Sequence, residues 1–371
     1  MKQLLKITSI LIVSALISGC MCSEKRGTML NSSDSFMVGE YELADNVFGE
    51  IIELKGENIL KDALFTFSET ELLVRDSILI LKNNPRGNTH IVQLFRLPDL
   101  ELITKIGIPG RGPLEFSYNA RIVPTPDTSA LFYLYNGAVQ EVYRVTKSFS
   151  IEMVTSKFNT LGMDIYSADN VMNLSANKYL FTERTRENNT LFQLDISEDG
   201  TSLSKLIDLN FKPNVNTLMA YFGYPAINME RNRFAYAYRY YRRLLFSDLN
   251  ADSIRVVKFN AAEYDPSTDR VADGENLNTT YYHNRAVSGE QYAYFTYLGK
   301  NVDEISKERS NGTYAQYLEL WDWNGNPVKK FKLDQFGYIT VDEKNNKLYL
   351  ASRDYEHPFF VYDLEGQLRR D

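Results

Sequence analysis

A short phrase recurs six times along the 371-residue chain: an alternating apolar stretch, a turn rich in Asp, Gly, Asn or Pro, and a second strand-like stretch. The copies begin at Leu94, Val142, Leu191, Leu244, Leu318 and Phe359. Most copies start about 40 to 53 residues apart, a period typical of repeats that contain one four-stranded blade. Alternating apolar residues between such turns indicate β-strands joined by hairpins. The repeat therefore predicts an all-β chain folded as a six-bladed β-propeller.

Each copy extends backwards into two further strands joined by a tight turn, which gives four strands per repeat. The last copy leaves few residues for the outermost strand of the sixth blade. Because an open ring would expose a sheet edge, we expect the alternating stretch Phe48–Ile59 to pair with the C-terminal blade and close the ring. The pattern leaves open a count of five or seven blades, and a β-sandwich with coincidental spacing.

The composition supports a β-rich chain and argues against a nucleic-acid partner. The sequence contains 25 Tyr and 21 Phe but only 2 Trp, and Tyr and Phe favour half-buried pleated surfaces. The 41 basic residues are outnumbered by 48 acidic ones, whereas nucleic-acid binding favours a basic surface.

The N-terminal residues differ from the rest of the chain. Lys2 and Lys6 precede the mostly apolar stretch Ile7–Ile17, as in a secretion signal. The segment Ile17-Ser18-Gly19-Cys20 resembles the lipobox of bacterial lipoproteins, which implies cleavage before Cys20 and acylation of that residue. An ordinary signal peptide with an incidental cysteine is the alternative.

The lipobox resemblance predicts three parts: a signal peptide over residues 1–19, an acylated cysteine and flexible tether over 20–40, and one propeller over 41–371. We therefore expect an extracytoplasmic protein, periplasmic or on the outer membrane or cell surface, whose membrane partner is reached through its lipid anchor. Two insertions, 260–282 and 299–312, lengthen the fifth repeat.

One segment carries a resemblance to a known family. It is LFRLPDLELITKIGIPGRGPLEF, Leu94–Phe116, and its second half is rich in glycine and proline. With the N-terminal lipobox, it is similar to the TolB-like six-bladed propeller lipoproteins. The resemblance implies the propeller fold and an extracytoplasmic location, and it supplies no catalytic residues.

The glycine-rich run of this segment is not a phosphate-binding loop, because no helix follows it and its prolines remove amide donors. We expect a rigid connection between blades, with Glu115 or Arg111 contacting neighbouring backbone or charge. The residues of this structural motif are Gly107, Gly110, Arg111, Gly112, Pro113, Glu115 and Phe116.

No metal or cofactor is predicted. The run from Asp248 to Ser253 has oxygen side chains at calcium-loop spacing, but it lacks the glycine and the final glutamate of such a loop. The three histidines, His90, His283 and His357, are scattered and form no zinc-binding motif.

The remaining candidates lie in loops. In a propeller, the loops between the second and third strands of each blade, and the connections between blades, emerge on one face around the channel mouth. Arginine and tyrosine gathered there suit recognition of carbohydrate, peptide or carboxylate. The predicted ligand-binding residues are Arg184, Arg186, Arg239, Tyr241, Arg353, Tyr355 and His357.

These observations predict a lipid-anchored module that binds or scaffolds a protein, peptide or glycan, and no catalytic residue is nominated. The alternative is a sugar-active hydrolase or lyase with its site at the channel mouth. A purely structural component of the cell envelope is a third possibility. A pair of carboxylates about 5 to 9.5 Å apart at the mouth would favour glycoside hydrolysis.

Overall fold

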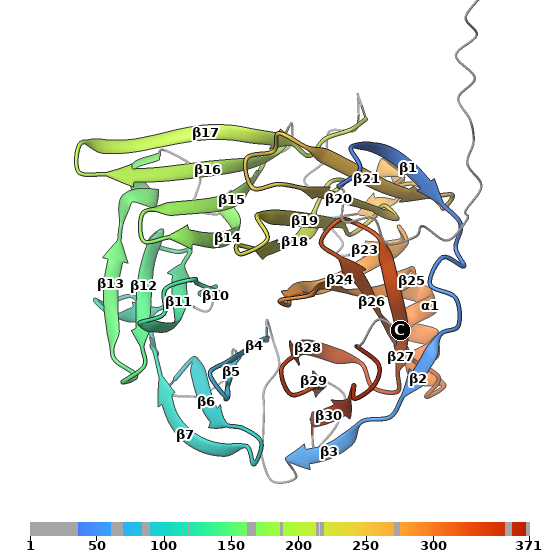
Figure 1. The fold of residues 1–371 in the computed structure, drawn as a ribbon, viewed down its shortest axis with the longest axis horizontal. Coiled ribbons are helices and arrows are strands. Elements are labelled where there is room, and N and C mark those ends of the chain that lie inside the picture. The colour runs from blue at the N-terminus through green and yellow to red at the C-terminus, as the bar shows by residue number, and fades with distance from the viewer. Residues whose placement is uncertain are drawn as a thin grey trace, which may run out of the picture.

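Six β-sheets stand like blades around a central channel (Figure 1). The computed structural model describes residues 36–60, 70–83, 90–117, 119–161, 168–185, 188–212, 215, 219–270, 275–352 and 358–368. The predicted count of six blades is confirmed, and the alternatives of five or seven blades and of a β-sandwich are wrong. No helix within the described ranges has the length and apolar character needed to cross a membrane.

The first three blades each contain four antiparallel strands, which follow one another in sequence from the channel outwards. Blade 1 consists of β4 (Glu71–Arg75), β5 (Ile78–Lys82), β6 (Val92–Arg96) and β7 (Glu101–Ile106). Blade 2 consists of β10 (Arg121–Val123), β11 (Ala130–Asn136), β12 (Glu141–Thr146) and β13 (Ile151–Thr155). Blade 3 consists of β14 (Ala168–Ser175), β15 (Lys178–Arg184), β16 (Asn189–Ser197) and β17 (Gly200–Asp208).

The other three blades use the N-terminal residues as well. Blade 4 consists of β18 (Gly223–Asn228), β19 (Arg233–Tyr238), β20 (Arg243–Ser247), β21 (Ile254–Phe259) and β1 (Gly39–Leu43). Blade 5 consists of β24 (Thr280–Ser288), β25 (Tyr292–Lys300), β26 (Gln316–Asp322), β27 (Pro327–Leu333) and β2 (Ile52–Leu54). Blade 6 consists of β28 (Gly337–Asp342), β29 (Lys347–Ser352), β30 (Phe359–Asp363) and β3 (Glu57–Leu60).

Residues 39–60, the N-terminal strap, therefore run along the outside of three blades (Figure 1). β3 pairs antiparallel with β30, so the prediction that Phe48–Ile59 closes the ring on the C-terminal blade is confirmed. The sequence did not predict the parallel pairing of β1 with β21 and of β2 with β27. β1 begins two residues before the predicted start of the propeller. The predicted leader, the acylation site Cys20 and most of the tether lie outside the described residues.

The connections hold the short elements. These are β8 (Ile108–Pro109), β9 (Glu115–Phe116), η1 (Lys157–Leu161), η2 (Pro266–Thr268), β22 (Asp269–Arg270), β23 (Glu275–Asn276) and α1 (Val302–Ser310). The helix α1 lies within the predicted insertion 299–312 and is an addition to the β-propeller. The side chain of Asn301 accepts from the Glu304 amide and Glu304 accepts from the Asn301 amide, a reciprocal cap that starts this helix.

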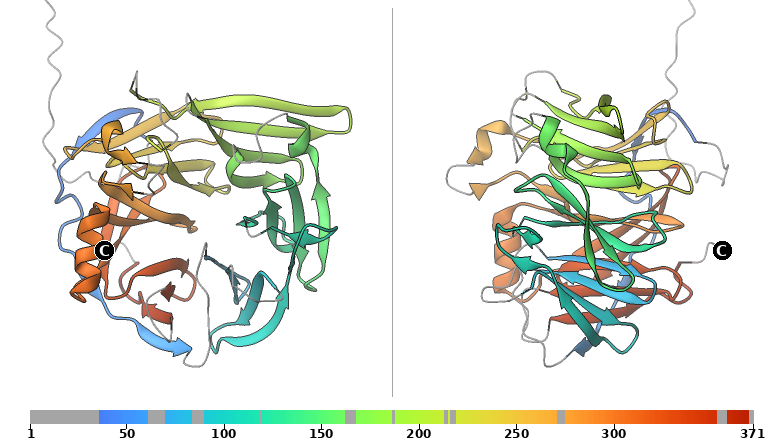
Figure 2. Two further views of the ribbon diagram at one scale, coloured as in Figure 1. Left: turned by 180° about the vertical axis from the view of Figure 1, so that it is seen from behind. Right: turned by 90° about the vertical axis from the view of Figure 1, so that its left-hand side faces the viewer.

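The ring has two faces. On the loop face, second and third strands are joined, as by 239–242 in blade 4 and by the segment containing α1 in blade 5. On the turn face, first and second strands are joined, as by 229–232, and third and fourth strands are joined, as by 323–326. In the side view of Figure 2, the orange α1 projects from one face of the ring.

The core lies between neighbouring blades, where tyrosine side chains both fill apolar layers and donate hydrogen bonds. Tyr236 and Tyr238 are each 1% exposed and pack in the layer between blades 3 and 4. Their hydroxyls donate to the carbonyl oxygens of Tyr221 at 2.9 Å and Leu209 at 3.0 Å. A tyrosine ring can thus fill an apolar layer while its hydroxyl satisfies backbone carbonyls at the blade ends. This explains why a β-rich chain of this kind carries so much tyrosine.

Candidate functional site

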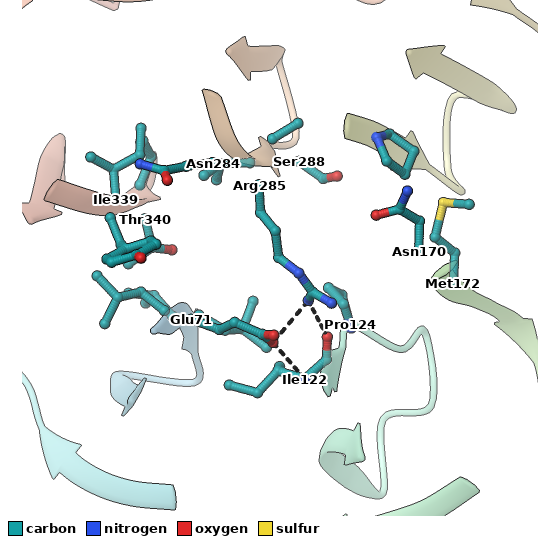
Figure 3. Close-up of a pocket in the computed structure, with 18 of the residues that line it drawn as sticks. Glu71, Ile122, Pro124, Asn170, Met172, Asn284, Arg285, Ser288, Ile339 and Thr340 are labelled. Carbon is teal, nitrogen blue, oxygen red and sulfur yellow. Dashed lines mark hydrogen bonds and ion pairs between the residues drawn. The ribbon is translucent and has the colours of Figure 1, made fainter. Parts of the chain in front are cut away.

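The first strands of the blades enclose a cavity of about 130 Å³ in the central channel (Figure 3). All six blades contribute side chains to its lining. The apolar part of the wall consists of Leu73, Val171, Met172, Ile227, Val287, Ile339 and Val341. The polar part includes Glu71, Asn170, Asn284, Arg285 and Ser288.

A bulge in β24 places Arg285 in the cavity. Between the pairs His283–Thr296 and Val287–Tyr294, β24 advances four residues while β25 advances two. The residue before Arg285, Asn284, takes a left-handed backbone with φ of 60°. Bulges of this kind redirect side chains and recur beside functional sites. Arg285 consequently reaches across the channel from blade 5 towards blades 1 and 2 (Figure 3).

Glu71 receives that guanidinium. Arg285 Nη1 lies 3.0 Å from Glu71 Oε2 and donates to the Ile122 carbonyl oxygen at 2.6 Å. Arg121 Nη1 lies 3.1 Å from Glu71 Oε1, and the Ile122 amide donates to Oε2 at 2.7 Å. Burial opposes ionisation of Glu71, but Arg285, Lys82, Arg121 and the Ile122 amide outweigh it and lower the pKa of this carboxyl group. Glu71 is therefore an anion at neutral pH.

A second bulge repeats the arrangement in blade 3. Asn170 of β14 also has a positive φ, 51°, and its Nδ2 donates to the Gly223 carbonyl oxygen of blade 4 at 3.3 Å. Asn284 Nδ2 likewise donates to the Gly337 carbonyl oxygen of blade 6 at 2.9 Å. Each asparagine thus joins its blade to the next one.

The two acceptor glycines sit at the start of the first strand in blades 4 and 6. A Cβ at Gly223 would lie 2.4 Å from the Ala237 carbonyl oxygen, and one at Gly337 would lie 2.2 Å from that of Ala351. These first strands lie too close to the second strands for any side chain at that position.

One buried hydroxyl group in the lining lacks a partner. Thr70 is 3% exposed, and its Oγ1 has no hydrogen-bond partner among the described residues. An engineered apolar cavity of about 150 Å³ can hold benzene, so the channel cavity has room for one ring or one branched side chain. The site offers apolar walls, one open hydroxyl group and a fixed ion pair.

The predicted residues of the loop face come together in part. The Cζ atoms of Arg184 and Arg239 lie 4.6 and 6.0 Å from the centroid of the Phe222 ring. Tyr241 is 5% exposed, and its ring lies 4.7 Å from that of Phe211. Burial raises the pKa of Tyr241. Arg184 and Arg239 are half-buried at the junction of blades 3 and 4, whereas Tyr241 packs inside that junction.

Other predicted ligand-binding residues cannot be placed beside them. Arg186, Arg353, Tyr355 and His357 lie outside the described residues.

The glycine-rich motif forms a compact connection between blades 1 and 2. Glu115 Oε2 accepts from the amides of Arg111 at 2.8 Å and Gly112 at 2.7 Å. A Cβ at Gly110 would lie 1.9 Å from that oxygen, and one at Gly107, where φ is 74°, would lie 2.8 Å from Ile91. β8 and β9 pair in parallel across the motif and bring Phe116, which is fully buried, against the core. Glycine is required here so that the backbone can fold around a carboxylate.

The described residues offer no metal centre. No three His, Cys, Asp or Glu side chains in this part of the chain come together as metal ligands. Asp248 Oδ1 accepts from the amides of Asn250 and Asp252, and its Oδ2 accepts from that of Ser253. Its carboxylate therefore stabilises the turn between β20 and β21.

The channel residues were missed by reasoning from the sequence, which looked for the site in loops. A signal was present, because Glu71 stands directly before the apolar run Leu72–Val74 and Arg285 lies inside another strand-like stretch. A charged residue within an inner strand indicates that its side chain faces the central channel and not the apolar layers between blades.

Comparisons with known proteins agree with the fold. The family model described as TolB-like 6-blade propeller-like matches residues 47–344. A crystal structure of a DUF4221 family member from Bacteroides vulgatus has 9% identity and a TM-score of 0.53, covering 84% of this chain and 96% of its own. A putative exported protein from Bacteroides fragilis has 11% identity and a TM-score of 0.48, covering 87% of this chain and 98% of its own.

No curated protein matches the sequence. The DUF4221 structure shares the fold, and the family model covers most of the chain. The chain belongs to the TolB-like six-bladed propeller family.

Proposed function

We propose that this protein is a lipid-anchored, extracytoplasmic binding module whose central channel receives part of a protein, peptide or glycan ligand. The observation that carries the proposal is the state of Glu71. It is the only acidic side chain among the described residues that line the cavity, and it is held as an anion by two guanidinium groups and a backbone amide. A group fixed in this way orients a ligand and does not donate a proton.

The rival function, hydrolysis of a sugar, requires more than this lining supplies. Glycoside hydrolysis generally uses two carboxyl groups, one of which must be protonated at working pH. The lowered pKa of Glu71 removes it as the acid, and the described lining holds no second carboxylate. The arrangement therefore supports binding over hydrolysis.

The size of the cavity favours a protein or peptide over a glycan. Small-molecule sites usually enclose about 300–1,000 Å³, and this cavity encloses about 130 Å³. A whole sugar ring with its hydration fits poorly among apolar walls, whereas one side chain of a partner matches the space. The partner would insert that side chain and rest its backbone on the rim.

The position of the N-terminal strap fits an anchored module. The Phe36 ring, just before the strap, lies 4.7 Å from Cζ of Arg233, which begins β19 directly after the turn 229–232 on the turn face. The predicted tether would therefore reach the propeller on the turn face. The loop face, with Arg184 and Arg239, would point away from the membrane and towards partners.

A ligand screen on the chain from Met21 onwards tests the binding function. This chain lacks the leader and the anchor but keeps the whole propeller and its strap, because the described residues begin at Phe36. Peptides, proteins and glycans are added and thermal unfolding is followed. A ligand at a hundred times its dissociation constant should stabilise the fold by about 2.7 kcal/mol.

Two matched variants then locate the site. Val341→Phe adds a ring to the cavity wall and should abolish the ligand-induced shift, whereas Leu203→Phe, on the exposed outer strand β17, should leave it intact. An unchanged shift in Val341→Phe would exclude the channel as the site. Anchoring is tested separately in the full chain, where Cys20→Ala should move the protein from the membrane fraction to the soluble fraction.

A further inference from the structure

A second hollow lies on the turn face, between the turns of blades 4 and 5. It has a volume of about 620 Å³, within the range of small-molecule sites. Its lining is mostly polar and consists of Arg231, Arg233, Gln291, Tyr292, Asp322, Trp323 and Asn324. None of these residues contributes to the channel site.

The two arginines in this hollow lack acidic partners. Arg231 Nε donates to the Glu290 carbonyl oxygen at 2.7 Å. Arg233 donates to the Asn232 carbonyl oxygen at 3.2 Å and to Asn324 Oδ1 at 3.5 Å. No carboxylate among the described residues lies within 4.0 Å of either guanidinium group. Each guanidinium has five N–H donors, so most of the ten remain available to a ligand.

Buried side chains hold the hollow in shape. Asn228, 8% exposed, donates from Nδ2 to the carbonyl oxygens of Gly289 at 3.1 Å and Glu290 at 3.0 Å. Its Oδ1 accepts from the Arg231 amide at 2.9 Å. Trp323 Nε1 donates to the Gly289 carbonyl oxygen at 3.3 Å. The turns of the two blades are thereby fixed to each other, and a site fixed in advance loses little freedom on binding.

Asp322, the acidic residue of the lining, already accepts hydrogen bonds within its own turn. Asp322 Oδ1 accepts from the amides of Asn324 and Asn326 at 3.0 and 2.8 Å, and its Oδ2 accepts from Asn326 Nδ2 at 2.9 Å. Arg255, 1% exposed, supports the same turn by donating to the Asn324 carbonyl oxygen at 2.7 Å. Asp322 therefore shapes the turn, and the two arginines set the charge that a ligand would meet.

The rest of the turn face limits the size of the ligand. Its turns carry mainly acidic residues, among them Asp76, Asp99, Glu198, Asp199, Asp248, Glu290 and Glu365. An extended polyanion would be repelled by them, whereas a small anion in the hollow would contact the two guanidinium groups directly, and acidic residues farther away than the Debye length of about 8 Å at 0.15 M salt would be largely screened.

We propose that this hollow binds a small solute that presents a carboxylate or similar oxyanion to Arg231 and Arg233. Guanidinium groups bind planar oxyanions through paired hydrogen bonds. The side-chain amides of Gln291 and Asn324 stand beside them and suit hydroxyl groups on the same solute. An acidic sugar combines both features.

Calorimetric titration of the chain from Met21 tests this site with a matched pair of probes. Glucuronate, which has a carboxylate, should bind saturably, and glucose, which lacks it, should bind at least about 10-fold more weakly. Arg231→Gln with Arg233→Gln should weaken glucuronate binding by at least about 10-fold. The control, Lys307→Gln with Arg309→Gln on α1, removes the same charge from the loop face and should change binding less than about 2-fold.

Further variants and a competing anion separate loss of oxyanion recognition from loss of folding. Arg231→Lys with Arg233→Lys keeps the charge but loses the paired geometry, so intermediate binding is expected. Inorganic phosphate should compete with glucuronate if the oxyanion provides the main contact. Equal binding of glucose, full binding by the double Gln variant with an unchanged melting temperature, or no binding of any oxyanion would overturn the proposal. Val341→Phe, which fills the channel cavity, should not affect glucuronate binding. The proposal for this hollow can therefore fail or hold independently of the proposed channel site.

Discussion

Replacing Glu319 by Gln should destabilise the propeller far more than the same change at a surface glutamate. Glu319 of β26 is fully buried. Its Oε1 accepts from Arg242 Nη2 at 3.1 Å and from Lys330 Nζ at 2.9 Å, and its Oε2 accepts from the Tyr282 hydroxyl group at 3.1 Å. Burial opposes ionisation of Glu319, but Arg242 and Lys330 outweigh it and lower the pKa of its carboxyl group.

The magnitude follows from what the substitution leaves behind. The side chains of Arg242 and Lys330 are 4% and 10% exposed, so both cations would remain buried without the Glu319 carboxylate, and Arg242 would keep only the exposed Asp45, 3.6 Å from its Nε. Removing one partner of a buried ion pair costs about 3–5 kcal/mol. At about 2.1 cal/mol/K of unfolding entropy per residue, a ring of about 330 residues should lose about 4–7 °C in melting temperature.

The control is an ion pair formed by Lys332, which lies two residues after Lys330 on β27. Lys332 pairs with Glu53 at 2.6 Å, but these side chains are 38% and 67% exposed. Glu53→Gln should therefore shift the melting temperature by no more than about 1 °C. Thermal unfolding of both variants, followed by circular dichroism at neutral pH, gives the comparison. Equal shifts would refute the argument that burial makes the Glu319 network necessary.

Two further substitutions test the geometry of the channel. Gly337→Ala should lower the urea midpoint, because its Cβ would lie 2.2 Å from the Ala351 carbonyl oxygen, whereas Gly137→Ala, whose Cβ has no atom closer than 3.7 Å, should not. Glu71 has a lower pKa in the folded chain, so its ion pairs stabilise fully above about pH 4.3 and less as pH falls through the folded value. Glu71→Gln should flatten that acid dependence of the unfolding free energy; an unchanged slope would contradict the assignment.

The blade count could be predicted because its signals are local. Glu71–Arg75 and Ile78–Lys82 alternate around a short turn, and such a hairpin can be identified from consecutive residues. The glycine-rich connection is local too, since Glu115 contacts amides only three and four residues away. Closure of the ring followed from an incomplete last blade and an alternating stretch near the other end.

The pairing partners of the strap could not be predicted in full. Ile52–Leu54 carries the alternation of a strand, but nothing in three residues specifies a parallel partner 279 positions away, as between Ile52 and Phe331. That choice depends on which outer strands lie within reach once the ring has formed. Phe48 then fixes the strap, because its ring packs edge-on to Trp321 at 5.3 Å.

The sequence by itself indicated the strands and turns of the repeats, a six-blade period and the closing segment, because backbone propensity and alternation act between near neighbours. Only the tertiary structure decided where charges converge. Arg285 reaches Glu71 because the register of β24 against β25 leaves two residues over, and Arg231 joins Arg233 in a hollow because two blades pack side by side. Register and blade packing arise from contacts between distant segments, and no short stretch of sequence contains them.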